Sequence, residues 1–190
     1  ANRSPFPPLK KVIFDTDIGI DDAMALLFLH HAPEVELIAI TTGFGNASVS
    51  DTTRNALYVK ELFSMSAAVY AGSATPVGNA LGEGYADFVH GKNGLGDISL
   101  TTPMCEAEAM PAAEAIVELV EANPHEISIV AVGRMTNLAM ALALDPKLPS
   151  LVKELVVMGG VFGYNGHRGN VSPVAEANIA GDPLAADRVF

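Results

Sequence analysis

Continuous apolar runs alternate with helix-like segments along most of this sequence. The apolar runs lie at residues 11–16, 35–42, 67–71, 127–132 and 154–160, and the helical patterns lie at 21–32, 50–64, 111–122 and about 136–144. Runs without polar alternates are typical of parallel strands that are buried on both faces. We therefore predict a single α/β domain over residues 1–190, with an open, mostly parallel, Rossmann-like sheet covered by helices on both faces.

Two glycine-rich stretches interrupt this pattern. Residues 72–104 are expected to form a long loop, and residues 159–173 are a second glycine-rich segment. Loops of such length in compact domains tend to carry function. Asp182 and Pro183 then have the pattern of a helix N-cap and first-turn proline. The helix that follows is short and uncapped, so we expect the natural polypeptide to continue beyond Phe190.

The composition excludes several classes of partner. A formal net charge of −11 argues against a nucleic-acid-binding surface and against docking on anionic membranes. The sequence has no apolar run long enough to span a bilayer. Cys105 is the single cysteine, so no internal disulfide can form, and the expected setting is the reducing cytoplasm.

Four aspartates crowd the end of the first predicted strand. Asp15, Asp17, Asp21 and Asp22 fall within eight residues, and Gly19 allows a sharp turn between them. Two carboxylates 4 Å apart repel by about 4 kcal/mol at an effective dielectric near 20, whereas a helix N-terminus offsets only about 0.3–1 kcal/mol. A bound cation would offset the repulsion, and hard oxygen ligands suit Ca²⁺ or Mg²⁺. A helix cap beside a solvated surface is the alternative.

One alternative enzyme class uses a similar strand end. Mg²⁺-dependent phosphatases of the haloacid dehalogenase type also place two aspartates, spaced like Asp15 and Asp17, after their first strand. Residues 18–20 here lack the threonine-bearing turn of that pattern, and the adjacent Asp21–Asp22 pair is foreign to it.

A series of motifs resembles the inosine–uridine nucleoside hydrolase family. The first is DTDIGIDDAMALL at residues 15–27. The others follow in the family's order: ITTGFGNAS at 40–48, TRNAL at 53–57, VHGKNGLG at 89–96, VGRMTNLAMAL at 132–142, VVMGG at 156–160 and GNVSPVAEANIAGDPLAA at 169–186. The resemblance covers about residues 11–190.

The resemblance implies hydrolysis of the N-glycosidic bond of ribonucleosides, in purine and pyrimidine salvage, by a Ca²⁺-activated water. Asp17 would be a calcium ligand and the general base, with Asp22 and the backbone carbonyl of Thr136 as further ligands. Met158 would line the ribose pocket, and Asp15 would be a structural residue next to the metal-binding side chains. The ribose hydroxyls would be bound by Asp21, Asn46, Asn170, Glu176 and Asn178. The family also suggests a homodimer or homotetramer.

The chemistry is consistent with these residue types. Glycosidic cleavage passes through an oxocarbenium-like state, which carboxylates stabilise. A bound metal ion acidifies water. His90, in the glycine-rich segment at 89–96, is expected to lie near the nucleobase.

The sequence also departs from the family pattern. Arg134 replaces a frequent proline, Asn93 replaces a frequent acidic residue, and Ala177 replaces a common phenylalanine, which removes an apolar wall near the sugar. Family members also run further and carry another calcium-binding aspartate in the part beyond Phe190. These departures leave a non-catalytic ribose- or nucleoside-binding relative as a second hypothesis.

Overall fold

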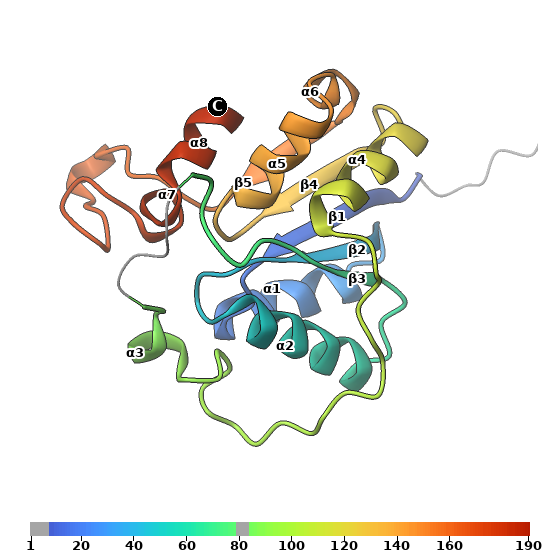
Figure 1. The fold of residues 1–190 in the computed structure, drawn as a ribbon, viewed down its shortest axis with the longest axis horizontal. Helices are drawn as coiled ribbons and strands as arrows, with labels where there is room; N and C mark the ends of the chain where they lie inside the picture. Colours follow the sequence, from blue (N-terminus) through green and yellow to red (C-terminus); the bar gives the residue numbers. More distant parts are fainter. Residues whose placement is uncertain (1–7, 79–83) are drawn as a thin grey trace, which may run out of the picture.

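The structure, a computed structural model, describes residues 8–78 and 84–190. Five strands form one sheet: β1 (Lys10–Thr16), β2 (Val35–Thr42), β3 (Ala68–Ala71), β4 (Ile127–Ala131) and β5 (Glu154–Val157). Their order is β3-β2-β1-β4-β5, and every adjacent pair is parallel (Figure 1). The prediction of a parallel α/β sheet is confirmed.

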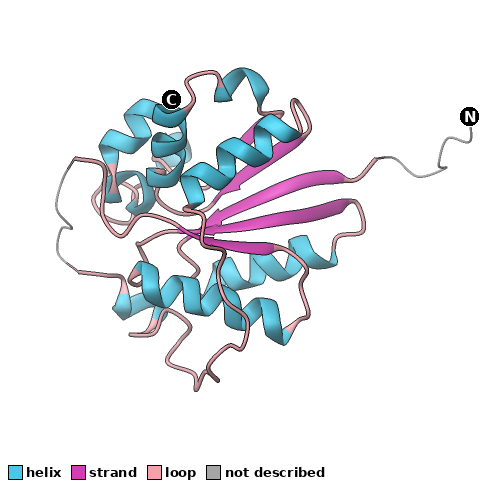
Figure 2. Ribbon diagram, turned by 45° about the vertical axis from the view of Figure 1, so that its right-hand side comes forward, coloured by secondary structure: helices cyan, strands magenta, loops and turns pink. Residues whose placement is uncertain are grey.

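Helices cover both faces of the sheet (Figure 2). One face carries α1 (Ile20–His31) and α2 (Val49–Leu62), and the other carries α4 (Ala112–Ala122), α5 (Thr136–Leu144) and α8 (Pro183–Val189). Asp182 caps α8 as predicted, because its side chain accepts a hydrogen bond from the Ala185 backbone N–H.

The expectation of a long loop over residues 72–104 is wrong in part. Within it lies a short helix, α3 (Asp87–His90), while residues 79–83 of this stretch fall outside the described part of the chain. The short helices α6 (Leu148–Leu151) and α7 (Ala177–Gly181) and a 3-10 turn (Tyr164–Gly166) were not predicted either. Elements of three to five residues are too short to display a helical period.

The core has two layers because side chains in β1 alternate between the faces. Ile13 packs with Ile116, Ile127 and other residues of the α4–α5 side. Phe14 packs with Leu26 of α1 and other residues of the α1–α2 side. Both β1 side chains are fully buried, which fixes the central strand and therefore the position of the residues that follow it.

β1 lies at the centre of the sheet: β2 and β3 are added on one side of it, and β4 and β5 on the other. In open α/β sheets, ligands bind beyond the carboxyl ends of the strands at such a switch point. The segments that follow β1, β2 and β4 meet there.

Among the described residues, no helix is both long and apolar enough to cross a membrane.

Candidate active site

Asp17 and Asp22 form a buried carboxylate pair at this edge of the sheet. Asp17 directly follows β1, and Asp22 lies in the first turn of α1; the two residues are 3% and 4% exposed. Burial raises the pKa of both carboxyls, and the negative charge of Asp22 raises the pKa of Asp17 further, well above its usual range. The pair is therefore held together at an electrostatic cost.

Backbone and amide groups surround the pair. The Asn46 backbone N–H donates to Asp17 Oδ2 at 2.9 Å, and its side-chain Nδ2 donates to Asp22 Oδ2 at 3.2 Å. The Gly19 backbone N–H also donates to Asp22 Oδ2, at 2.9 Å. Asp17 Oδ1 is buried and has no hydrogen-bond partner among the described residues. A buried acceptor of this kind is costly unless something else binds it.

Two glycines bring backbone against the Asp17 carboxylate. A β-carbon at Gly45, in the segment after β2, would overlap the carboxylate, and one at Gly133, after β4, would lie 3.0 Å from Oδ1. A side chain at either position would push the carboxylate away, so this close packing of backbone against Asp17 needs glycine at both positions.

The other two aspartates of the predicted cluster lie apart from this pair. Asp15 is buried, and its Oδ1 accepts hydrogen bonds from Thr41 Oγ1 at 2.6 Å and Asn137 Nδ2 at 2.9 Å. Burial raises the pKa of Asp15 to about 6. It thus ties β1 to β2 and α5. Asp21 is exposed, with Oδ1 3.9 Å from His90 Nδ1. The expected cluster of four carboxylates is therefore a buried pair with two neighbours.

His90 packs against the first residue of α1. Its Nδ1 accepts a hydrogen bond from the Ile20 backbone N–H at 3.2 Å. A β-carbon at Gly19 would lie 2.6 Å from the same nitrogen, so glycine is needed for the ring to approach. The structure therefore brings His90 to the edge of the sheet where Asp21 lies.

Thr136 and Asp182 form a second buried polar contact. Thr136 begins α5, and its Oγ1 donates to Asp182 Oδ2 at 2.6 Å. The Val77 backbone N–H donates to the same oxygen at 2.9 Å. Asp182 is 1% exposed. The residue predicted only as a helix cap therefore also joins α5, α8 and the segment after β3.

The remaining predicted ribose ligands gather after β5 and around α7. Glu176 caps α7 by accepting hydrogen bonds from the Asn178 and Ile179 backbone N–H groups. Asn178 Nδ2 donates to the carbonyls of Val132 and Met158, both at 2.9 Å. Asn170 Oδ1 accepts from the Ala177 N–H at 2.9 Å. Met158 is half-exposed. Through Asn178, α7 is hydrogen-bonded to the segments that follow β4 and β5.

Sequence reasoning did not include Arg134 among the site residues, although it noted the residue as a departure from the family motif. The guanidinium carbon lies 4.6 Å from the centre of the Phe44 ring. Burial lowers the pKa of this arginine, while the carboxylates of Asp17 and Asp182 raise it. Arg134 therefore brings positive charge into the neighbourhood of the carboxylate pair.

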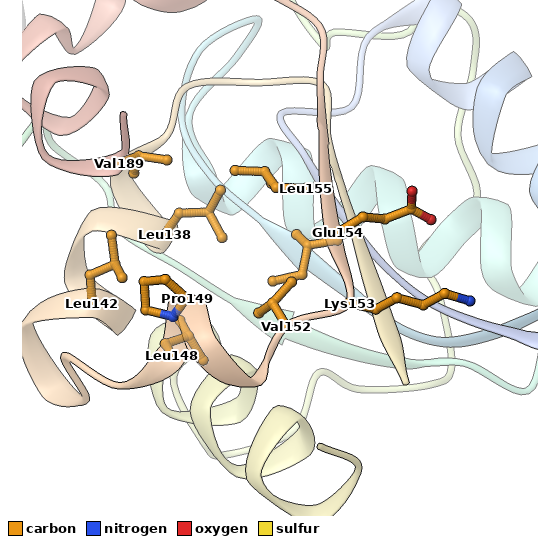
Figure 3. A pocket seen from close by; sticks show the side chains of 10 residues that line it. Leu138, Leu142, Leu148, Pro149, Val152, Lys153, Glu154, Leu155 and Val189 are labelled. Atoms are coloured by element: carbon orange, nitrogen blue, oxygen red, sulfur yellow. The ribbon is translucent and has the colours of Figure 1, made fainter. Parts of the chain in front are cut away.

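Two cavities differ in character. A cavity of about 670 Å³ lies beside the site and is lined by Tyr85, Phe88, Arg134, Asn170, Ala177 and Asp182, among others. A second, apolar cavity of about 300 Å³ lies between α5, α6, β5 and α8 (Figure 3). No predicted site residue lines this second cavity, so the first one is the candidate for a ligand.

Comparison with known proteins decides the family. The model of a family described as inosine-uridine preferring nucleoside hydrolase matches residues 12–190. The chain belongs to this nucleoside hydrolase family. The resemblance found in the sequence is thus confirmed, and the parallel sheet is the fold of its solved relatives.

Relatives of this nucleoside hydrolase chain include well-matched proteins. Uridine nucleosidase 1 of Arabidopsis thaliana is 48% identical over 182 residues, which cover 95% of this chain and 53% of that protein. The inosine-uridine preferring nucleoside hydrolase of Leishmania major is 41% identical over 184 residues, covering 95% and 57%. A solved plant nucleoside hydrolase has a TM-score of 0.91 at 43% identity, over 96% of this chain and 57% of that one. The chain thus spans little more than half the length of these relatives.

Proposed function

We propose that the protein hydrolyses the N-glycosidic bond of ribonucleosides and releases ribose and free base. The observation that carries this proposal is the buried Asp17 carboxylate, which leaves one oxygen without a partner among the described residues. In the metal-free protein, burial and the charge of Asp22 raise the pKa of Asp17. A cation between the two carboxylates would lower that pKa again and keep Asp17 ionised. It is therefore suited to accept a proton from an attacking water.

The donor set fits a hard divalent cation, and we propose Ca²⁺. Asp17 and Asp22 would hold it through carboxylate oxygens, with the Thr136 backbone carbonyl as a third ligand. Among the described residues, no group of three histidine, cysteine or acidic side chains could hold a metal ion. Calcium takes six to eight oxygens, so water, substrate and the rest of a longer chain would complete the set. When bound, the cation would supply positive charge that makes a nearby water more acidic.

The polar groups around the pair would orient the ribose. Asp21, Asn46, Asn170, Glu176 and Asn178 offer carboxylate and amide groups, which pair well with vicinal hydroxyls. Several of them are already fixed by backbone hydrogen bonds. Such preorganised groups reject analogues that lack a hydroxyl. Met158 would line the ribose pocket, and His90 would lie near the base.

The test is hydrolysis by the intact, full-length protein with calcium, measured as reducing sugar released from uridine and inosine. Asp17→Asn keeps the side-chain shape but removes the base, and it should lower kcat by about a hundredfold or more. Asp187→Asn, on the exposed side of α8, is the matched control. No release from any purine or pyrimidine nucleoside would overturn the proposal.

Two further measurements distinguish the two other hypotheses from nucleoside hydrolysis. A non-catalytic nucleoside-binding relative, which Ala177 in place of the common phenylalanine motivates, would bind ribose in calorimetry without turnover. A Mg²⁺-dependent phosphatase would release phosphate from a generic phosphate ester. Membership of the nucleoside hydrolase family leaves that last alternative without support.

We also propose that the protein acts in the cytoplasm as a homodimer or homotetramer. Ile20, Met24 and Phe28, spaced four residues apart along α1, are 45%, 69% and 73% exposed. We infer that a second copy of the chain covers this stripe, with its own α1 antiparallel. That arrangement sets the acidic first turn of one helix beside the histidine-bearing last turn of the other.

A further inference from the structure

Arg134 contacts two segments that come from separate parts of the chain. It follows Gly133 in the segment after β4, and its guanidinium carbon lies 4.6 Å from the centre of the Phe44 ring, in the segment after β2. A β-carbon at Gly181 would overlap Arg134 Nε, so the backbone at the end of α7 also packs against this side chain. The position of the guanidinium is therefore restricted by both segments.

Phe44 belongs to the segment that surrounds the Asp17 carboxylate. Its ring is 1% exposed. It is followed by Gly45, whose backbone packs against that carboxylate, and by Asn46, whose backbone N–H donates to Asp17 Oδ2 at 2.9 Å. A shift of Phe44 would therefore displace both contacts, because they follow it within two residues.

Stacking on Phe44 is the specific contact that the structure gives to the charge of Arg134. In the part of the chain that the structure describes, no hydrogen bond or ion pair joins its guanidinium to another residue, although Asp17 and Asp182 lie in its neighbourhood. A cation over an aromatic ring is attracted by the π electrons, and burial strengthens this attraction. Arg134 is partly buried, so the stacking stabilises the observed position of Phe44.

We propose that Arg134 is a positioning residue that holds residues 44–46 against Asp17 by stacking on Phe44. This inference rests on the proposed role of Asp17 as calcium ligand and base. The arginine stands where the family frequently has a proline, whose ring fixes the backbone but cannot reach across to Phe44. Its positive charge alone would repel a cation at Asp17. The positioning effect and the charge effect on calcium binding therefore have opposite signs.

Amide hydrogen exchange of the intact, metal-free protein, read by NMR, tests the contact directly. Arg134→Met keeps a long side chain but removes the charge. The Asn46 N–H should then exchange about fivefold to thirtyfold faster, the factor expected for loss of a partly buried cation–π contact. Arg134→Lys keeps a cation and should restore most of the protection. In a Phe44→Leu background, Arg134→Met should change the Asn46 rate by less than about twofold.

Two controls separate positioning from a general effect on stability. The Ile13 N–H, in the central strand β1, is the internal reference and should keep its exchange rate in Arg134→Met. Arg188→Met, which replaces an exposed arginine of α8, is the matched control variant and should leave the Asn46 rate unchanged. Equal acceleration at Asn46 and Ile13 would overturn the inference, because it would indicate a general loss of stability.

Calorimetric titration with calcium tests the consequence for the site. Arg134→Met should weaken calcium binding by about the same factor as it accelerates exchange, whereas loss of a merely repelling charge would tighten binding. Calcium binding that is unchanged or tighter would overturn the inference. So would unchanged exchange at Asn46, or an undiminished effect of Arg134→Met in the Phe44→Leu background.

These readings do not depend on turnover. A parent protein that binds calcium but hydrolyses no nucleoside would contradict the proposed function alone. If the parent binds no calcium, the proposed cation fails, and exchange at Asn46 still decides whether Arg134 holds residues 44–46 in place.

Discussion

Replacing Asp182 with alanine should destabilise the protein by about 4 kcal/mol. Asp182 is 1% exposed and accepts three hydrogen bonds, from Thr136 Oγ1 and from the backbone N–H groups of Val77 and Ala185. Loss of the cap to Ala185 costs about 1 kcal/mol. Each of the two other bonds to a charged acceptor contributes about 1.5 kcal/mol or more.

The assay is urea unfolding of the full chain followed by circular dichroism, since the sequence has no tryptophan. Asp182→Asn retains one acceptor oxygen and should lose about half as much stability. Asp187→Ala, exposed on the same helix, should stay within about 0.5 kcal/mol of the parent protein. If Asp182→Ala stays within about 1 kcal/mol as well, the three hydrogen bonds do not join α5, α8 and the segment after β3 as argued.

Three further predictions concern the site and its surroundings. Burial raises the pKa of Asp15 from 3.8 to about 6. Between these two pH values the folded chain keeps a proton that the unfolded chain has released, so the free energy of unfolding falls as the pH rises. In metal-free protein, the unfolding free energy of Asp15→Asn relative to the parent should therefore grow by about 2–3 kcal/mol from about pH 4 to about pH 7.5, and a flat difference would contradict this. Gly45→Ala should weaken calcium binding in calorimetry by about tenfold or more, because the added β-carbon would overlap the Asp17 carboxylate. Gly43→Ala is the control and should bind calcium normally, because a β-carbon there meets only an ordinary contact at 3.7 Å. Phe28→Glu should lower the mass measured by light scattering to that of a monomer, whereas Met140→Glu, on the opposite face of the sheet, should leave the mass unchanged. An unchanged mass for Phe28→Glu would exclude α1 as the contact between copies.

The positions of the strands could be predicted because burial on both faces of the sheet leaves unbroken apolar runs in the sequence, whereas the order of the strands was not predicted. Ile13, Phe14 and Ile40 belong to unbroken apolar runs and are fully buried on opposite faces of the sheet. Strand positions matched the sequence pattern to within a few residues. The short helices escaped prediction because their ends depend on tertiary contacts. In α3, for example, His90 is held by the backbone of Ile20, seventy positions away in the chain.

The candidate site could be predicted only in part. The sequence brings Asp17 and Asp22 to one strand end, and the structure pairs them. It does not indicate that Asp15 turns to Thr41 and Asn137, since those partners come from β2 and α5. Hydrogen-bond partners distant in sequence leave no local pattern. For the same reason, the second role of Asp182 was not visible.

The burial of Asp17 differs in origin from the burial of the core. Backbone of the segments after β2 and β4 presses against this carboxylate at Gly45 and Gly133, positions that carry no side chain. Such packing removes water from the carboxylate and so raises its pKa, yet it leaves Oδ1 without a partner among the described residues. An apolar wall would desolvate the group equally but would offer nothing to hold a substrate. Here the Asn46 backbone N–H fixes Asp17 Oδ2 instead, while Oδ1 keeps its acceptor capacity, so the pocket desolvates the carboxylate without using both of its oxygens.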